Sequence, residues 1–272
     1  MSCRTLLLLI ALTRLCAAAV GTTEQTWQHQ ISDGIIAANK DLAKSEQFFL
    51  AATRTAEAFG PNDPRLGTSF NSLGLVLKAE LRFADAERAF MKALGILEKA
   101  YGPESLDVGN VCFNIASVIV AGGHEEAALP YIQRSRTIYL SRLGSVSPKT
   151  ATASCMLGIA YRVTGKFVDA EGPLKQCADI RESNGGVDNP ELAEAMYNLG
   201  LVYQHQGKFA LADSRLKLAV KIREITLGVD SPAFAEALEA HASLLKTMGR
   251  DQDSAREQAM AAAVRRIGKK TK

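Results

Sequence analysis

The stretch Met196-Tyr-Asn-Leu-Gly-Leu-Val-Tyr203, followed by Gln206-Gly-Lys-Phe209, decides the fold of this chain. Its apolar and small residues recur at the i, i+3, i+4, i+7 spacing of one helix face: Met196, Leu199, Gly200 and Tyr203. After Gly207, a second stripe with helical spacing follows: Phe209, Ala212, Leu216, Ala219 and Ile222. We therefore predict two helices, over 190–206 and 208–227, that fold back on each other.

The same pattern recurs every 42 residues along nearly the whole chain. Glycine marks the period at Gly60, Gly102, Gly144, Gly186 and Gly228. Proline follows at Pro64, Pro148, Pro190 and Pro232, with Leu106 in the remaining place. A glycine after a helix takes the left-handed conformation at little cost, and a proline suits the first position of the next helix. One period is therefore a helix–turn–helix hairpin, which needs its neighbours to bury its apolar face.

Small residues form further columns in this register, and they predict where two helices cross closely. One column holds Gly74, Ala116, Gly158, Gly200 and Ala242. We predict an all-α solenoid of about six hairpins. Four full repeats span 64–231. A degenerate first repeat spans 22–63, with helices over 27–38 and 41–59, and a final repeat, a capping helix and a basic tail span 232–272.

Residues 1–21 have the pattern of a cleaved secretory signal peptide. Arg4 supplies a basic start, Leu6 to Leu12 is apolar, and Ala17-Ala18-Ala19 gives a cleavage site. An uncleaved helix, or a start codon placed upstream of a cytosolic domain, are the alternatives, and Arg14 inside the apolar segment counts against a signal. We predict export to a bacterial periplasm or the extracellular space, and a cytoplasmic location if the segment is not a signal.

Cysteine usage favours a fold without disulfides. Cys112, Cys155 and Cys177 remain after the leader, an odd number whose spacing fits no metal site. In the repeat register Cys112 and Cys177 fall in columns of small or apolar residues. We expect both to be buried thiols.

Composition excludes several classes of function. The 32 basic and 29 acidic residues give a net charge of +3, too weak to indicate nucleic-acid binding. No apolar run reaches the roughly 18 residues that an integral membrane span needs. The four histidines share no ligand spacing, and no nucleophile elbow or phosphate loop is present. We predict no catalytic residues, cofactor or metal, and we expect His241 to be a partly exposed residue of the final repeat.

The run Met196–Tyr203, with Gln206-Gly-Lys-Phe209, Ala212 and Ala219, resembles the tetratricopeptide repeat. The 42-residue period, the linker Leu227-Gly-Val-Asp-Ser-Pro232 and Lys221-Ile-Arg-Glu are similar to the kinesin-light-chain type of that repeat. The resemblance covers nearly everything after the leader. It implies a right-handed superhelix whose concave side, lined by the first helix of each hairpin, binds peptides or partner proteins.

Carried over residue by residue, the resemblance implies a peptide-binding groove. Its candidate residues are Asn71, Lys78, Asn110, Phe113, Asn114, Arg162, Glu194, Tyr197, Asn198 and Gln204. We expect the asparagines to be exposed and to bond the backbone of an extended segment, and Lys78 and Arg162 to favour acidic ligands. Met156 and Ala240 depart from the asparagine pattern. The basic set of carboxylate clamps is absent, which argues against capture of a free peptide C-terminus.

These observations predict a non-enzymatic scaffold for an unidentified protein or peptide partner. The alternative is a structural subunit whose array lies buried in a larger assembly, and an edge patch of exposed apolar residues would favour it. The basic tail is either a solvated helix end or a contact for an acidic surface or lipid: Arg265, Arg266, Lys269, Lys270 and Lys272.

Overall fold

The computed structural model describes residues 3–270, and the side chains of residues 21–186 and 188–266. These residues form helices joined by turns, and no strand occurs among them. The α-helices are α1 (Cys3–Ala38), α2 (Leu42–Glu57), α3 (Pro64–Ala79), α4 (Phe83–Tyr101), α5 (Leu106–Ala121), α6 (Glu125–Leu143), α7 (Pro148–Val163), α8 (Phe167–Gly185), α9 (Pro190–His205), α10 (Phe209–Leu227), α11 (Pro232–Thr247) and α12 (Asp251–Lys270). The predicted all-α class is confirmed.

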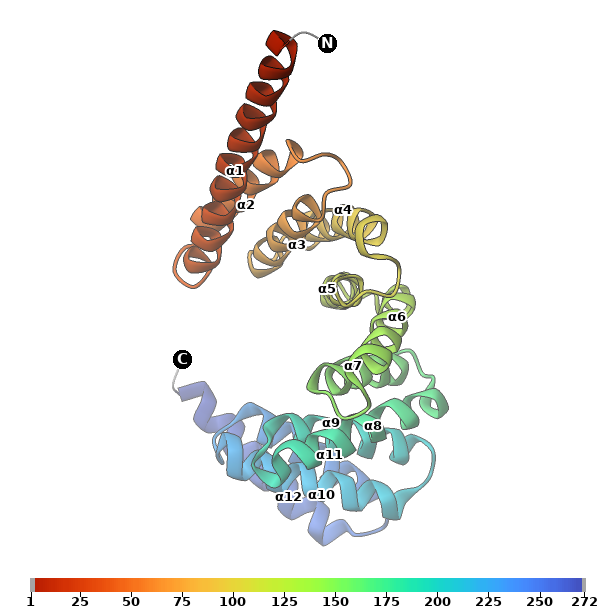
Figure 1. Cartoon of the computed structure of the whole chain (residues 1–272). Helices are drawn as coiled ribbons and strands as arrows, with labels where there is room; N and C mark the ends of the chain where they lie inside the picture. Colours follow the sequence, from red (N-terminus) through yellow and green to blue (C-terminus); the bar gives the residue numbers. More distant parts are fainter. Residues whose placement is uncertain (1–2, 271–272) are drawn as a thin grey trace. The chain divides into compact units, whose positions relative to one another are not determined.

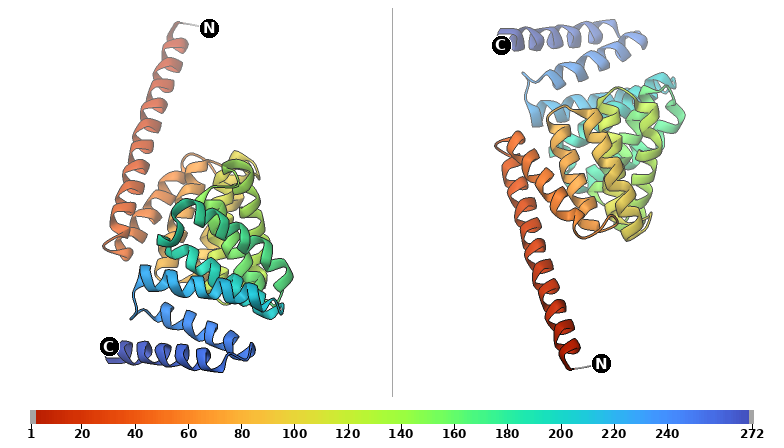
Figure 2. Two further views of the ribbon diagram at one scale, coloured as in Figure 1. Left: turned by 90° about the horizontal axis from the view of Figure 1, so that it is seen from below. Right: turned by 90° about the horizontal axis from the view of Figure 1, so that it is seen from above.

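Two compact units divide the chain, Met1–Gly123 and His124–Lys272, and each is a stack of antiparallel helices (Figure 1). In the first unit, α1 pairs with α2 and α3 with α4, and α5 packs against α4. In the second unit, α6 packs against α7, and the hairpins α7–α8, α9–α10 and α11–α12 follow. Figure 2 shows α11 and α12 side by side in both views.

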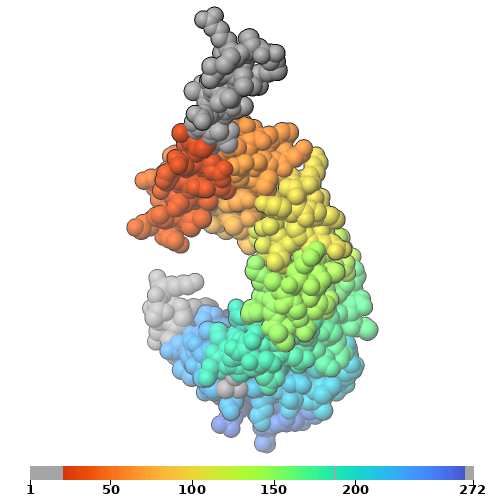
Figure 3. Space-filling view, in the orientation of Figure 1, coloured from red at the N-terminus to blue at the C-terminus, as the bar shows by residue number. Residues whose placement is uncertain are grey.

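Successive hairpins within a unit are in contact, as the space-filling view shows on its visible face (Figure 3). The first helices of neighbouring hairpins also touch one another: α3 touches α5, α7 touches α9, and α9 touches α11. Each unit therefore has a layer made of first helices, and the candidate groove residues lie on it.

The helices begin and end where the columns predict. Proline is the first residue of α3, α7, α9 and α11, and Leu106 takes that place in α5. Side chains cap several of these starts: the Asn189 carbonyl oxygen, for example, accepts a hydrogen bond from the backbone N–H of Glu191 at 2.9 Å. The predicted helices 190–206 and 208–227 correspond to α9 and α10. The prediction of 27–38 was too short, because α1 extends back to Cys3.

The small-residue column lies where the two helices of a hairpin approach most closely. A Cβ atom added to Gly158 would lie 2.4 Å from Cγ of Leu174, and one added to Gly200 would lie 2.6 Å from Cγ of Leu216. Real Cβ atoms essentially never come so close to another heavy atom. The predicted helix crossings are therefore confirmed at these positions.

A leucine occupies a turn position that is glycine in the four hairpins that follow it. Gly123, Gly165, Gly207 and Gly249 have φ angles of 78°, 76°, 73° and 71°, and Leu81, in the same place of the repeat, has φ 62°. Its side chain is 74% exposed, so little packing offsets the strain. A left-handed backbone costs an L-residue with a Cβ about 1–2 kcal/mol.

Leu81→Gly is therefore expected to stabilise the first unit by about 0.5–1 kcal/mol, because the relieved strain exceeds the extra chain entropy of glycine. Urea unfolding of the full chain would measure the change. Leu81→Ala is the matched control, since it keeps the Cβ and removes the exposed side chain. Equal gains from both variants would contradict the explanation by strain.

The expectation of a fold without disulfides is wrong. Cys155 on α7 and Cys177 on α8 form a disulfide, with their Cα atoms 5.3 Å apart. The reason is the antiparallel register of the hairpin: both residues are equally far in sequence from Lys166 in the turn, so they face each other across it. Gly158 and Leu174 contact each other in the same register. Cys112 is buried in α5, as expected.

The predicted signal peptide concerns residues 1–21, and the side chains of residues 1–20 lie outside those that the structure describes. Its cleavage stays a prediction. Among the described residues, no helix combines the length and the apolar character that a membrane crossing requires.

Candidate functional site

The ten candidate groove residues fall into two sets, one on each unit. Asn71 and Lys78 lie on α3, and Asn110, Phe113 and Asn114 lie on the neighbouring α5. In the second unit, Arg162 lies on α7, and the other four lie on α9: Glu194, Tyr197, Asn198 and Gln204. Each set thus spans two first helices that are in contact.

In the first unit, two asparagines are joined across the helices. Nδ2 of Asn114 donates a hydrogen bond to Oδ1 of Asn71 at 2.9 Å, and both side chains are half-buried. Each amide keeps one group that the described residues do not bond: the Asn71 NH₂ and the Asn114 carbonyl oxygen. A donor and an acceptor side by side are what the backbone of an extended peptide requires.

Lys78 lies on the same face. Its Nζ donates a hydrogen bond to Oγ of Ser117 at 2.8 Å, and burial lowers the pKa of Lys78 below its usual value. A lowered lysine pKa means that the surroundings leave the ammonium group poorly solvated. An anionic ligand group would relieve this. Asn110 and Phe113 are half-buried on α5.

The second unit contradicts the expectation that Asn198 is exposed. Its side chain is 4% exposed, and both ends of the amide are bonded. Nδ2 donates to the backbone carbonyl of Glu194 at 2.8 Å, and Oδ1 accepts from Nε of Arg162 at 2.9 Å. Because α9 presses this position against α7, Asn198 holds the Arg162 side chain instead of reaching out to a ligand.

The guanidinium of Arg162 is therefore fixed from behind by a buried amide. The described residues offer no hydrogen-bond partner to its two terminal nitrogens, and the side chain is half-buried. A guanidinium held in this way presents a planar fork that matches a carboxylate in bidentate geometry. Sequence reasoning named both residues but did not foresee the bond between them.

Tyr197 is supported by residues that sequence reasoning missed. The Arg223 guanidinium carbon lies 4.5 Å from the Tyr197 ring centroid, and the Tyr197 hydroxyl lies 3.4 Å from Glu236. Burial raises the pKa of Tyr197 above its usual value. Glu194 is exposed and Gln204 is half-buried. The Tyr197 side chain, which lies on α9, therefore packs its ring against the Arg223 guanidinium.

The 42-residue spacing of arginines could have predicted that Arg223 has a role in the fold. Arg181, Arg223 and Arg265 form a column, and they pair with Glu191, Glu236 and Glu239 respectively. The first two arginines are buried. These ion pairs explain part of the basic tail: Arg265 is paired with Glu239, whereas the side chains of residues 267–272 lie outside the described ones.

His241 also differs from its prediction. It is 4% exposed, and its ring nitrogens lie 3.0 Å from carboxylate oxygens of Glu257 and Asp213. Two acidic partners from other helices satisfy the ring, which is why it can replace an aliphatic residue in the interior. Within the described residues, no three His, Cys, Asp or Glu side chains are grouped so that they could hold a metal ion.

The sequence profile of the tetratricopeptide repeat family matches residues 66–107 and 192–233. A curated relative, the clustered mitochondria protein homolog of Aspergillus clavatus, is 25% identical over 99 residues, which are 36% of this chain and 8% of that protein. The chain therefore spans less than a tenth of this relative's length.

Two solved structures are similar in fold. Repeats of a putative kinesin light chain from Podosopora anserina superpose with a TM-score of 0.63 at 20% identity, covering 76% of this chain and 96% of that one. YrrB, described as a protein of this repeat class with an unusual peptide-binding site, gives a TM-score of 0.53 at 18% identity, covering 73% of this chain and 87% of that one.

Proposed function

We propose that this chain, in which the tetratricopeptide repeat profile matches residues 66–107 and 192–233, is a non-enzymatic scaffold that binds a protein or peptide partner on its first helices. The repeat fold supports a binding role in general, and the side chains of α7 and α9 support a partner with acidic groups. The observation that carries the proposal is the Arg162 guanidinium, which buried Asn198 orients and which the described residues leave without a partner at its terminal nitrogens.

The first unit supports the same kind of ligand by independent means. The amide pair of Asn71 and Asn114 offers one donor and one acceptor to a peptide backbone, whatever its side chains. Lys78 adds a poorly solvated cation beside the pair. An extended segment carrying carboxylates satisfies all three groups.

The proposal is tested on an array of 15-residue peptides that differ in the number and position of their acidic residues, with the full chain as the probe. Arg162→Gln is expected to weaken the binding of acidic peptides by about 10-fold or more, since a hydrogen bond to a charged group contributes about 1.5–3 kcal/mol. Arg162→Lys should rescue only part of this loss, because an ammonium lacks the planar fork.

Lys221→Gln is the matched control. It removes the same charge from an exposed position on α10, a second helix, and should leave binding unchanged. If both glutamine variants weaken binding equally, the effect comes from net charge and the α7–α9 face is not the site. If the wild-type chain binds acidic and neutral peptides alike, the proposed ligand class is wrong.

A specific observation supports the alternative, a structural subunit. On α1 of the first unit, Ile35 and Ile36 are 57% and 59% exposed, and Ile36 lines a surface cavity with Ala37, Phe48 and four charged residues. Exposed aliphatic residues grouped in this way mark contact surfaces. Light scattering measures the molar mass of the wild type and of Ile36→Glu in solution. An oligomeric wild type and a monomeric variant would favour assembly over capture of a free peptide.

We also propose that the protein is exported. The basic start and apolar run support this, and so does the Cys155–Cys177 disulfide, since disulfides persist in oxidising compartments and are rare in the cytosol. Intact-mass measurement of the cell-derived protein is expected to show a chain beginning near Val20 or Thr22. Retention of Met1 would overturn the proposal.

A further inference from the structure

One position of the repeat carries an ionisable residue in a column of aliphatic ones. Leu73, Ile115, Leu157 and Leu199 occupy this column in the earlier repeats, and His241 occupies it on α11. The residues that flank it have changed as well. Counted back by one repeat, Asp213 and Glu257 correspond to Glu171 and Arg215, so an acid and a base are replaced by two acids.

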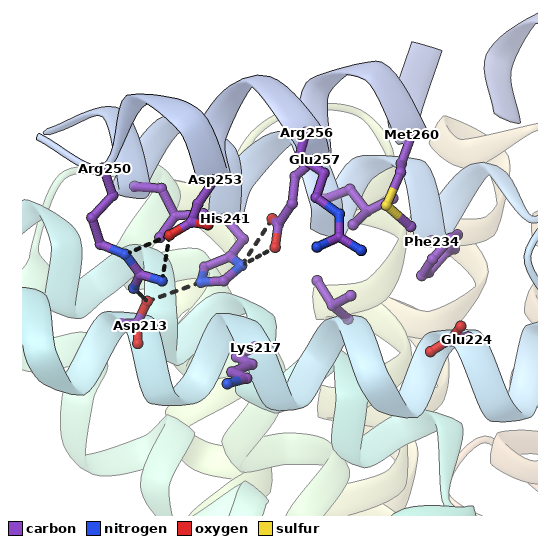
Figure 4. A pocket seen from close by; sticks show the side chains of 13 residues that line it. Asp213, Lys217, Glu224, Phe234, His241, Arg250, Asp253, Arg256, Glu257 and Met260 are labelled. Atoms are coloured by element: carbon purple, nitrogen blue, oxygen red, sulfur yellow. Dashed lines mark hydrogen bonds and ion pairs between the residues drawn. The ribbon is translucent and has the colours of Figure 1, made fainter. Parts of the chain in front are cut away.

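The three residues join three helices. His241 lies on α11 at the edge of a cavity of about 240 Å³, with α10 on one side and α12 on the other (Figure 4). Its Nε2 is 3.0 Å from Oδ1 of Asp213 on α10, and its Nδ1 is 2.9 Å from Oε2 of Glu257 on α12. The imidazole of α11 thus links α12 to α10.

The other charged groups around the cavity are accounted for on each helix. Arg250, in the turn before α12, pairs with Asp213 at 3.2 Å and with Asp253 at 2.8 Å. The remaining charged side chains of the lining are Lys217 and Glu224 on α10 and Arg256 on α12. With a protonated His241 the lining holds four acids and four bases. Loss of that proton therefore leaves a net negative charge between α10 and α12.

The proton count at the ring explains why protonation matters. A protonated imidazole donates through both nitrogens, so both carboxylates receive a hydrogen bond. A neutral imidazole has one N–H, so one carboxylate then faces a nitrogen lone pair. We propose that His241 is a pH-dependent clamp, which fastens α12 to α10 and α11 at mildly acidic pH and loosens it as the pH rises.

The direction of the pKa agrees with this geometry. Burial alone lowers the pKa of His241, but the hydrogen bonds to Glu257 and Asp213 oppose burial and raise the pKa above its usual value of 6.5. A histidine with a raised pKa stabilises the folded state fully below its unfolded pKa, and the contribution is lost as the pH rises through the folded pKa. The clamp is therefore closed below about pH 6.5.

Loosening of α12 would uncover an apolar surface on α11. Phe234, Ala235 and Leu238 are buried there against Ala261 and Val264 of α12. The clamp thus regulates the packing of α12 on α11, which is separate from the α7–α9 face, and it does not depend on the function proposed for that face.

Hydrogen exchange of the full chain at pH 6.0 and at one unit above the imidazole pKa of His241 measured by NMR, corrected for intrinsic exchange rates, tests the proposal. Protection of residues 251–266 in α12 is expected to fall by about 10-fold between the two pH values, the equivalent of one charge-assisted hydrogen bond. Protection of α9 should change much less. An equal change in α9 and α12 would overturn the proposal.

His241→Leu, which restores the residue type of the column, should abolish the pH dependence of α12. Retained pH dependence in this variant would assign the effect to another group and refute the clamp. Glu257→Gln serves as the second variant, because an amide replaces one carboxylate at nearly constant shape, and it should reduce the change to less than half. An imidazole pKa below 6.5, measured by NMR on the wild type, would likewise refute the proposal.

Discussion

Removal of the Cys155–Cys177 disulfide is expected to lower the free energy of unfolding of the second unit by about 3 kcal/mol. The two cysteines are separated by 22 residues, and closing a loop of this size restricts the unfolded chain by that amount. Because α7 and α8 belong to one hairpin, the native contacts between them remain when the bond is absent. The loss should therefore appear as lower stability with an unchanged helix content.

The measurement is urea unfolding of the oxidised wild type and of the double variant Cys155→Ser/Cys177→Ala. Serine is chosen for position 155 because it is half-buried, and alanine for position 177 because it is buried. Cys112→Ala is the control for the loss of a buried thiol outside the bridge. A double variant as stable as the control would contradict the expected contribution of the bridge. So would a wild-type protein whose stability does not change on reduction.

Gly200→Leu is expected to destabilise the α9–α10 hairpin by about 1–3 kcal/mol, the usual cost of overpacking a core. Even a Cβ atom at this position would lie 2.6 Å from Cγ and 2.9 Å from Cδ2 of Leu216, and 3.3 Å from its backbone nitrogen. The Leu216 side chain can turn away in part, but its backbone nitrogen cannot. The two helices must therefore move apart.

Gly95→Leu is the control for this substitution. Gly95 lies within α4 of the first unit, and nothing comes within 4 Å of a Cβ built on it. That variant should be neutral or slightly stabilising, because leucine favours helices more than glycine. Hydrogen exchange should confine the damage of Gly200→Leu to α9, α10 and their neighbours. Equal loosening of α9 and α10 by both variants would contradict a stack of locally stabilised hairpins.

Much of this fold was predictable from the sequence, because its determinants repeat. Proline at the start of α9, glycine in the turns and Gly200 at the crossing each act locally, and their recurrence makes them visible without a structure. The helix ends differ from their predictions by one residue in α9 and α10. The long extension of α1 was missed, because no column of the repeat reaches into the leader.

The side-chain partners were much less predictable. Cys177 was assigned to a column of small or apolar residues, whereas its pairing with Cys155 depends on the antiparallel register between α7 and α8. Asn198 was assigned to the groove by its place in the repeat, but the contact of α9 with α7 buries it. His241 acquires its partners from helices on both sides. In each case the contact that decides the outcome joins two helices, and the spacing of residues along the sequence does not predict it.

Within each described unit, a hairpin packs mainly against its neighbours in the stack. The coding sequence can therefore lose or gain whole repeats. In-frame loss or duplication of one 42-residue segment would join a turn residue such as Asn189 directly to an equivalent proline such as Pro232, with caps and crossings intact. Recombination could therefore alter the length of the array without redesigning its interior. The final segment is the exception, because His241 in its core bonds Asp213 of the segment before it as well as its own Glu257.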